Sequence, residues 1–248
     1  MSGHNKWSTI KRKKGLTDAK RSKSFSKIIK EITVAIKEGG DSDPFNNPRL
    51  RVAIINAKGV NMPKENITRA ISKASEKGGP NISETTFEAY ASHGVAVFIE
   101  CLTDNEKRTI ANVRMHINKY SGTLGTNGSL RFIFDRKGVF TIPIGTLDQD
   151  EFEMQMIEGG AEDIVLEDET FTVTTALEDF GQMQKKLEEL SIEAESAELE
   201  RIPKTYVKLD LESAKKVMKL IELLEDDDDV LNVFHNLEMT DELLESFE

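Results

Sequence analysis

The chain has 248 residues, of which 38% are hydrophobic and 31% are charged, and its formal net charge at pH 7 is -11. This composition is typical of a globular protein with a heavily charged surface, long enough for two or three domains. No apolar run approaches the length of a membrane-spanning helix, and the start lacks the apolar core of a secretory signal, so the sequence excludes both.

The charge is distributed unevenly along the chain. Residues 1–78 contain 18 Lys and Arg against 7 Asp and Glu, a balance of +11, whereas residues 79–248 contain 15 against 37, a balance of -22. Such a split predicts a polyanion-binding module attached to an acidic body. Because the acidic body repels nucleic acid, we expect binding on one face only.

The first predicted element is a helix that follows a basic tail. Residues 1–16 show no apolar periodicity and are predicted to be a mobile tail. From Thr17 to Gly39, apolar residues recur at helical spacing, namely Phe25, Ile28, Ile29, Ile32 and Ile36. Lysines recur on roughly the opposite face, namely Lys20, Lys23, Lys27, Lys30 and Lys37. The pattern predicts one packing face and one row of ammonium groups.

Two shorter helices are predicted next. Asn47 is the expected cap of a helix over 48–58, and Pro63 is the expected start of a helix over 63–77, with the turn "KGVNM" between them. The pair could be a helix-turn-helix that offers Lys64, Asn66, Arg69 and Lys73 to a groove. An ordinary helical hairpin is the preferred interpretation, because its turn residues are common in any such hairpin.

Beyond the apparent linker "GGPNISE" at 78–84, strands alternate with helices. The first group is a strand over 94–104, a helix over 106–120 that begins with a capping box of Thr103 and Glu106, and a strand over 129–135. A complete βαββαβ series follows, with its elements predicted over 138–144, 149–158, 163–168, 171–176, 179–190 and 194–202. The first group then resumes, with a strand over 205–210, a helix over 212–225 and a strand over 230–236.

These elements predict an α+β fold in which an N-terminal three-helix domain precedes two ferredoxin-like α+β domains, one inserted in the other. The predicted domains are a basic helical nucleic-acid-binding domain over 1–79, a split α+β domain over 80–136 plus 204–248, and an inserted ferredoxin-like domain over 137–203.

The candidate nucleic-acid contacts lie in the basic N-terminal part of the chain. The lysines and arginines would neutralise phosphates by counterion release, and the lone tryptophan would stack on an unpaired base. The alternative is a solvated helix face with a disordered tail. The candidates are Lys6, Trp7, Lys11, Arg12, Lys13, Lys14, Lys20, Arg21, Lys23, Lys27, Lys30, Lys64, Asn66, Arg69 and Lys73.

Catalytic and metal sites find little support in the sequence. The run "EDDDD" at 225–229 offers oxygen ligands, but consecutive acids in a loop diverge into water, so we expect a solvated loop and no metal. Cys101 could pair with a histidine (His93, His116 or His235) in nucleophilic catalysis. Cys101 lies in an apolar strand, however, where a free cysteine usually serves as a small buried hydrophobic side chain. The segment "GTLGTNGS" at 122–129 has glycines at the wrong spacing for a phosphate loop. We therefore expect no enzyme and no cofactor.

Several segments resemble the YebC family. They are "GHNKWSTIKRKKGLTDAKRSKSFSKIIKEIT", "NPRLRVAIINAKGVNMPKENITRAI", "GVAVFIECLTDNEKRTIANVR", "GTLGTNGSLRFIFDRKG" and "EDDDDVLNVFHN". One departure is "FEAYASHGVAV" at 87–97, where the family has a glycine-rich Tyr-Gly-Pro-Gly-Gly stretch. The resemblance implies one helical and two α+β domains and a non-enzymatic role in gene expression. Because the match begins at Met1, it also implies a bacterial cytoplasmic member, as does the single cysteine.

Two nucleic-acid partners remain open. Bacterial members of the family are described as DNA-binding transcriptional regulators, so the resemblance favours duplex DNA. The mitochondrial relative is a translational activator, and some bacterial members look like ribosome-associated factors that relieve stalling at proline runs. A mobile, Lys-rich tail with a lone tryptophan suits irregular rRNA or tRNA, which is recognised by shape and stacking. We expect a nucleic-acid-binding regulator that acts on DNA, with a ribosomal role as the alternative and no membrane partner.

Overall fold

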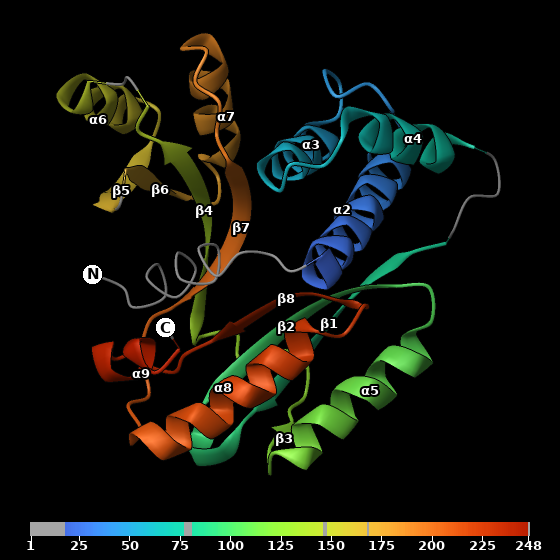
Figure 1. Cartoon of the computed structure of the whole chain (residues 1–248), viewed down its shortest axis with the longest axis vertical. Coiled ribbons are helices and arrows are strands. Elements are labelled where there is room, and N and C mark those ends of the chain that lie inside the picture. Colours follow the sequence, from blue (N-terminus) through green and yellow to red (C-terminus); the bar gives the residue numbers. More distant parts are fainter. Residues whose placement is uncertain (1–17, 77–80, 146–147, 168, 248) are drawn as a thin grey trace. The chain divides into compact units, whose positions relative to one another are not determined.

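The computed structural model describes residues 18–76, 81–145, 148–167 and 169–247. The fold is α+β, as the sequence predicts, with a helical N-terminal region followed by two antiparallel sheets that carry helices (Figure 1). The described helices are α2 (Asp18–Gly39), α3 (Pro48–Gly59), α4 (Lys64–Ser75), η1 (Ser92–Gly94), α5 (Glu106–Lys119), α6 (Gln149–Glu158), α7 (Phe180–Glu189), α8 (Leu211–Glu225) and α9 (Asp241–Glu245). The described strands are β1 (Ser83–Tyr90), β2 (Ala96–Thr103), β3 (Thr123–Leu124), β4 (Phe134–Pro143), β5 (Ala161–Glu167), β6 (Thr170–Ala176), β7 (Ser196–Pro203) and β8 (Val230–His235).

The chain forms two compact units. Of the described residues, the first unit contains 18–30, 81–135 and 203–247, and the second contains 31–76, 136–145, 148–167 and 169–202. Helix α2 therefore contributes its first part to one unit and its last part to the other. The three-domain boundaries derived from the sequence stay a prediction.

The sheet of the first unit has the strand order β3-β1-β2-β8, with antiparallel neighbours. Helices α5 and α8 cover one face of it (Figure 1). Alternate residues of β2 enter two cores: Val97, Ile99 and Cys101 pack with the helices, while Ala96 and Phe98 pack on the opposite face. Burial on both faces explains why this strand is apolar throughout.

Two strand predictions in this unit were wrong. Residues 129–133 form turns instead of a strand, because Gly128 and Leu130 donate their backbone N–H groups to the Glu88 carboxylate. Residues 205–210 form no strand either, and only Val207 makes a single bridge, to Leu237. The neighbours of β2 are β1 and β8, and β1 was not predicted from the sequence. Strand β1 pairs with β2 through a tight connection, so its loop closure costs little entropy.

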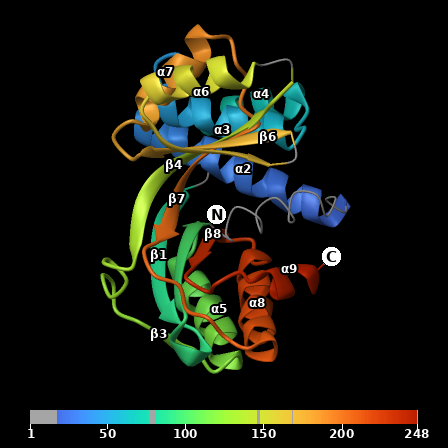
Figure 2. The ribbon, with the colours of Figure 1, turned by 90° about the vertical axis from the view of Figure 1, so that its left-hand side faces the viewer.

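The sheet of the second unit has the strand order β5-β6-β4-β7, which is the order of a ferredoxin-like βαββαβ unit. Each element of the predicted series is present, with bounds that differ by a few residues. Helices α6 and α7 cover one face (Figure 2), where the rings of Phe152 and Phe171 stack with centroids 4.3 Å apart. Two residues of α3, Val52 and Ile55, also pack against this core.

Two local predictions for the helices were also wrong. The cap of α5 is Asn105, whose side chain accepts from the Arg108 N–H at 3.1 Å, and not the predicted pair of Thr103 and Glu106. Thr103 instead accepts the N–H of Asn105 through its hydroxyl, at 2.9 Å. Ile29, predicted to pack, is 38% exposed, whereas Ile32 is fully buried.

Within the described ranges, no helix combines the length and the apolar character that crossing a membrane requires.

Candidate nucleic-acid interface

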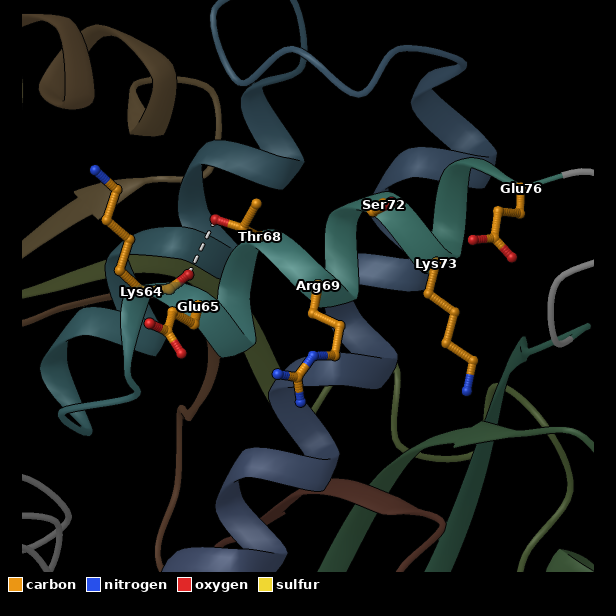
Figure 3. A pocket seen from close by; sticks show the side chains of 7 residues that line it. All are labelled: Lys64, Glu65, Thr68, Arg69, Ser72, Lys73 and Glu76. Atoms are coloured by element: carbon orange, nitrogen blue, oxygen red, sulfur yellow. Dashed lines mark hydrogen bonds between the residues drawn. The ribbon is translucent and has the colours of Figure 1, made fainter.

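The outer face of α4 carries a group of basic side chains. Figure 3 shows a surface pocket lined by seven residues of α4 and of the position that follows it, namely Lys64, Glu65, Thr68, Arg69, Ser72, Lys73 and Glu76. Arg69 and Lys73 extend in the same direction from consecutive turns of the helix (Figure 3). The opposite face of α4 is buried through Ile67, Ala70 and Ala74. The helix is therefore amphipathic, with its basic face in solvent.

The hairpin of α3 and α4 holds this face in place. Asn47 caps α3 by accepting from the Leu50 N–H at 3.0 Å, and its amide nitrogen donates to the Ala35 carbonyl at 2.8 Å. The turn between α3 and α4 is closed by a hydrogen bond from the Met62 N–H to the Ala57 carbonyl, at 2.9 Å. Asn61 in this turn has a φ of 57°. Asparagine tolerates this left-handed conformation better than most residues. The cap at Asn47 and the hairpin turn are thus as predicted.

Helix α3 attaches the hairpin to the sheet of the second unit. The Asn56 side chain pairs with both backbone groups of Ala197: its Nδ2 donates to the carbonyl at 3.1 Å, and its Oδ1 accepts from the N–H at 2.9 Å. Arg51 also forms an ion pair with Glu188, at 3.0 Å. Since these contacts use α3, they leave the outer face of α4 uncovered within this unit.

The basic groups of α4 are free for an external anion. Lys64, Arg69 and Lys73 are exposed, and their side chains form no ion pair with the part of the chain that the structure describes. Two carboxylates, Glu65 and Glu76, line the same pocket, so the face carries mixed charge with a basic excess. Asn66 is half-buried and lies one turn before Arg69 on the same helix.

The predicted lysines of α2 have a different environment. Lys23 forms an ion pair with Asp226 at 3.1 Å, and Lys27 donates to the Glu225 carbonyl at 2.6 Å. Lys30 reaches the Asp229 carboxylate at 2.9 Å and also donates to the carbonyls of Leu102 and Asp228. These three ammonium groups bind the acidic loop after α8, within the first unit, and are not presented to solvent as an open row.

Asp229 is the centre of this network. Its side chain is 5% exposed and accepts from Lys30, from the guanidinium of Arg108 at 2.7 Å and from the Thr109 hydroxyl at 3.0 Å. Burial alone raises the pKa of Asp229, but the hydrogen bonds from Lys30 and Arg108 outweigh it and hold the pKa below its ordinary value. The carboxylate is therefore ionised at neutral pH and fully partnered.

The expectation of a solvated loop at 225–229 was wrong for two of its aspartates. Asp229 is buried as described above, and the Asp227 side chain is only 9% exposed. Asp227 accepts from the Asn112 amide at 3.2 Å and lies 3.9 Å from His116 Nε2. Both acids turn inward because basic and polar donors of α2 and α5 converge on this loop.

The candidate nucleophile is buried. Cys101 is 1% exposed in β2, and burial, followed by the nearby charges of Asp227 and Asp229, raises its pKa to about 12. A thiol with such a pKa stays protonated at neutral pH and is a poor nucleophile. In the described ranges, no group of three or more His, Cys, Asp or Glu residues is placed to hold a metal ion.

The remaining sequence candidates divide into two groups. Lys20 and Arg21 are exposed at the start of α2. The tail candidates Lys6, Trp7, Lys11, Arg12, Lys13 and Lys14 lie outside the described residues. Arg108, Thr109 and Glu88 were not predicted from the sequence: Arg108 and Thr109 donate to the buried Asp229 carboxylate, and Glu88 is itself a buried carboxylate. No local signal identifies them, since their partners lie far away in the chain.

Comparisons with known proteins agree over nearly the whole chain. Residues 5–77 match the N-terminal domain of the TACO1/YebC protein family, and residues 82–237 match the second and third domains of that family. A relative from Amoebophilus asiaticus, named "Probable transcriptional regulatory protein", is 50% identical over 240 residues, covering 96% of this chain and 98% of its own. A relative from Geobacter sp. (strain M21) with the same description is 48% identical over 246 residues, covering 99% of each chain.

A solved structure is also similar. The crystal structure of a conserved hypothetical protein from Aquifex aeolicus aligns with a TM-score of 0.81 at 41% sequence identity, covering 92% of this chain and 94% of that one. Such coverage leaves few residues of either chain unmatched.

Proposed function

Since the chain belongs to the TACO1/YebC family, we propose that it is a non-enzymatic regulator of gene expression that binds nucleic acid through the basic face of α4 together with the basic N-terminal segment. The observation that carries the proposal is the set of unpaired cations on α4. An acidic protein that keeps Lys64, Arg69 and Lys73 free of ion pairs among its described residues retains a local site for phosphates.

Duplex DNA is the first proposed target. The relatives from Amoebophilus asiaticus and Geobacter sp. are named as probable transcriptional regulatory proteins, which supports a role at the level of transcription. Arg69 and Lys73 extend in the same direction from consecutive turns of α4, a spacing suited to contacts with neighbouring phosphates, and Lys64 lies at the other edge of the exposed face (Figure 3). In this proposal the basic N-terminal segment makes further contacts with phosphates. The protein would act in the cytoplasm.

Structured RNA on the ribosome is the second candidate, and one observation favours it. Asn66 is half-buried, which leaves Arg69 as the one exposed candidate of the two to read base edges. Binding that is directed mainly at phosphates suits rRNA or tRNA, which proteins recognise by backbone shape.

The test measures binding to duplex DNA and to ribosomes with the same pair of variants. The triple variant Lys64→Gln, Arg69→Gln and Lys73→Gln removes the basic face of α4, and the control variant Lys185→Gln, Lys216→Gln and Lys219→Gln removes three exposed lysines from α7 and α8. Both variants lose three positive charges, so a difference between them reports position and not net charge.

Two assays are run at about 0.15 M salt, where weak nonspecific contacts are screened. Binding to random and promoter duplexes tests the DNA role, and co-sedimentation with ribosomes tests the ribosomal role. We expect the α4 variant to lose binding in one assay while the control keeps it. Equal binding by the α4 variant and the wild-type protein in both assays refutes the α4 interface.

A further inference from the structure

The loop from Gly125 to Ile133, between β3 and β4, is built around a buried carboxylate. Glu88 of β1 is 7% exposed, and its oxygens accept from the backbone N–H groups of Gly128 at 2.7 Å and Leu130 at 2.6 Å and from the Ser129 hydroxyl at 3.0 Å. Burying a carboxylate is costly, and three hydrogen bonds to its charged form compensate for that cost. The loop is therefore held in one conformation.

This conformation presents an aromatic ring to solvent. Leu130 is 1% exposed and Phe134 is 6% exposed, and both pack with Phe98 in one core, whereas Phe132 between them is 81% exposed. The turn needs Gly128, whose φ of 91° disfavours any other residue. Because the residues on both sides of Phe132 are fixed in the core, its outward position is a property of the loop and not of a loose chain.

The charge around the ring favours an anionic ligand. Residues 107–134 contain five Lys and Arg and no Asp or Glu, in a chain whose net charge is -11. Arg131, next to Phe132, is exposed. The first acid after the loop, Asp135, forms an ion pair with Lys204 at 2.9 Å. The exposed ring therefore lies beside an exposed arginine, and the nearest acids, Asp135 and the buried Glu88, are each held by partners within the first unit.

The chain also contains a natural comparison. Phe45 is 85% exposed, as much as Phe132, but it follows Asp41 and Asp43. The Asp43 carboxylate accepts the Phe45 N–H at 2.9 Å, so a negative charge lies beside that residue. A nucleic acid is repelled there and attracted at Phe132.

We propose that the loop 125–133 binds an unpaired base of a single-stranded nucleic acid, with the base stacked on Phe132 and an adjoining phosphate bound by Arg131. This site is separate from the α4 face and extends the proposed function: it rests on nucleic-acid binding and adds that part of the ligand is unpaired. The other exposed residues of the loop with side chains (Thr126, Asn127 and Ser129) are polar. They suit a base edge and a sugar better than an apolar protein surface.

The experiment uses the full chain and a fluorescein-labelled RNA of about twelve nucleotides, within the site size that such surfaces bind, as a single strand and as a duplex. Fluorescence anisotropy measures both affinities for the wild-type protein and for Phe132→Ala, Phe132→Tyr and Phe45→Ala. All three substitutions lie at exposed or conservatively replaced positions, so the fold is retained.

We expect Phe132→Ala to weaken single-strand binding about tenfold, the loss of one stacked base, and to leave duplex binding unchanged. Phe132→Tyr, which keeps the ring, and Phe45→Ala are expected to bind single strands within about twofold of the wild-type protein. Unchanged single-strand binding by Phe132→Ala overturns the inference, as does an equal loss on single strand and duplex.

The two proposals can fail separately. If the wild-type protein binds the duplex but no single strand, the base-binding loop is refuted while the α4 interface stands. If it binds the single strand through Phe132 while the α4 variant loses nothing, the α4 interface is refuted and the loop is supported.

Discussion

Lys30 and Asp229, 199 positions apart in the chain, form an ion pair of 2.9 Å between Nζ and Oδ1. The contact joins the first part of α2 to the loop between α8 and β8, within the first unit. Arg108 approaches the same carboxylate from α5, so three elements meet at one buried acid. The acidic run at 225–229, predicted to be a solvated loop, therefore binds the lysines of α2.

The first prediction concerns the stability of this anchor. We expect Asp229→Asn to lower the free energy of unfolding by about 2–4 kcal/mol, because two cations lose a buried counterion. The control Asp226→Asn removes a carboxylate that is 59% exposed, and its pair with Lys23 contributes less than about 1 kcal/mol. Chemical denaturation of the two variants measures the difference. Similar losses for both would contradict a central role for Asp229.

The second prediction is the pH dependence of stability. The pKa of Asp229 is lower in the folded protein than its ordinary value of 3.8, so its contribution is complete above that value. The contribution disappears as the pH falls through the folded pKa. We expect the melting temperature of the wild-type protein to fall more steeply below about pH 4 than that of Asp229→Asn. Parallel curves for the two proteins would show that another group governs acid unfolding.

The third prediction concerns the single thiol. Because burial raises the pKa of Cys101 to about 12, we expect no reaction with a disulfide reagent at pH 8 while the protein is folded. In denaturant the thiol should react completely, since its pKa returns to about 8.5. Absorbance at the end of each reaction counts the thiols. Rapid labelling of the folded protein would mean that β2 opens readily.

The fourth prediction tests the attachment of α3. A Cβ at Gly59 would overlap the backbone carbonyl oxygen of Glu195, so Gly59→Ala should cost about 1–3 kcal/mol. Gly181, exposed in the first turn of α7, has no atom within 4 Å of the corresponding position. Gly181→Ala should therefore stabilise the protein by about 0.4–1 kcal/mol. Calorimetric melting of the two variants should give shifts of opposite sign, and a neutral Gly59→Ala would show that the connection there is loose.

The fifth prediction is the salt dependence of nucleic-acid binding. Each phosphate neutralised by a cation contributes about 0.9 to the slope of log affinity against log salt concentration on duplex DNA. The Gln variant of Lys64, Arg69 and Lys73 should therefore lower this slope by up to about 2.7. Binding is measured between about 0.05 and 0.2 M salt, with the Lys185, Lys216 and Lys219 variant as the control. An unchanged slope would mean that Lys64, Arg69 and Lys73 do not contact the phosphates.

The helices and the ferredoxin-like series could be predicted from the sequence because their signals are local. Asn47 caps α3 within three residues, and the apolar spacing of α8 needs no knowledge of the rest of the chain. Strand β1 was missed because "SETTFEAY" is mostly polar and begins within the segment interpreted as a linker. Its Glu88 is buried only because a loop some 40 residues later supplies the donors.

By itself, the sequence determined the class of fold, the order of the main helices and of the ferredoxin-like series, and the concentration of positive charge before residue 79. Only the tertiary structure decided which of those charges remain available. Lys30 binds Asp229, whereas Lys64, Arg69 and Lys73 are exposed without an ion pair among the described residues. The reason is physical: helical periodicity repeats within four residues, but the partner of a charge is set by long-range packing.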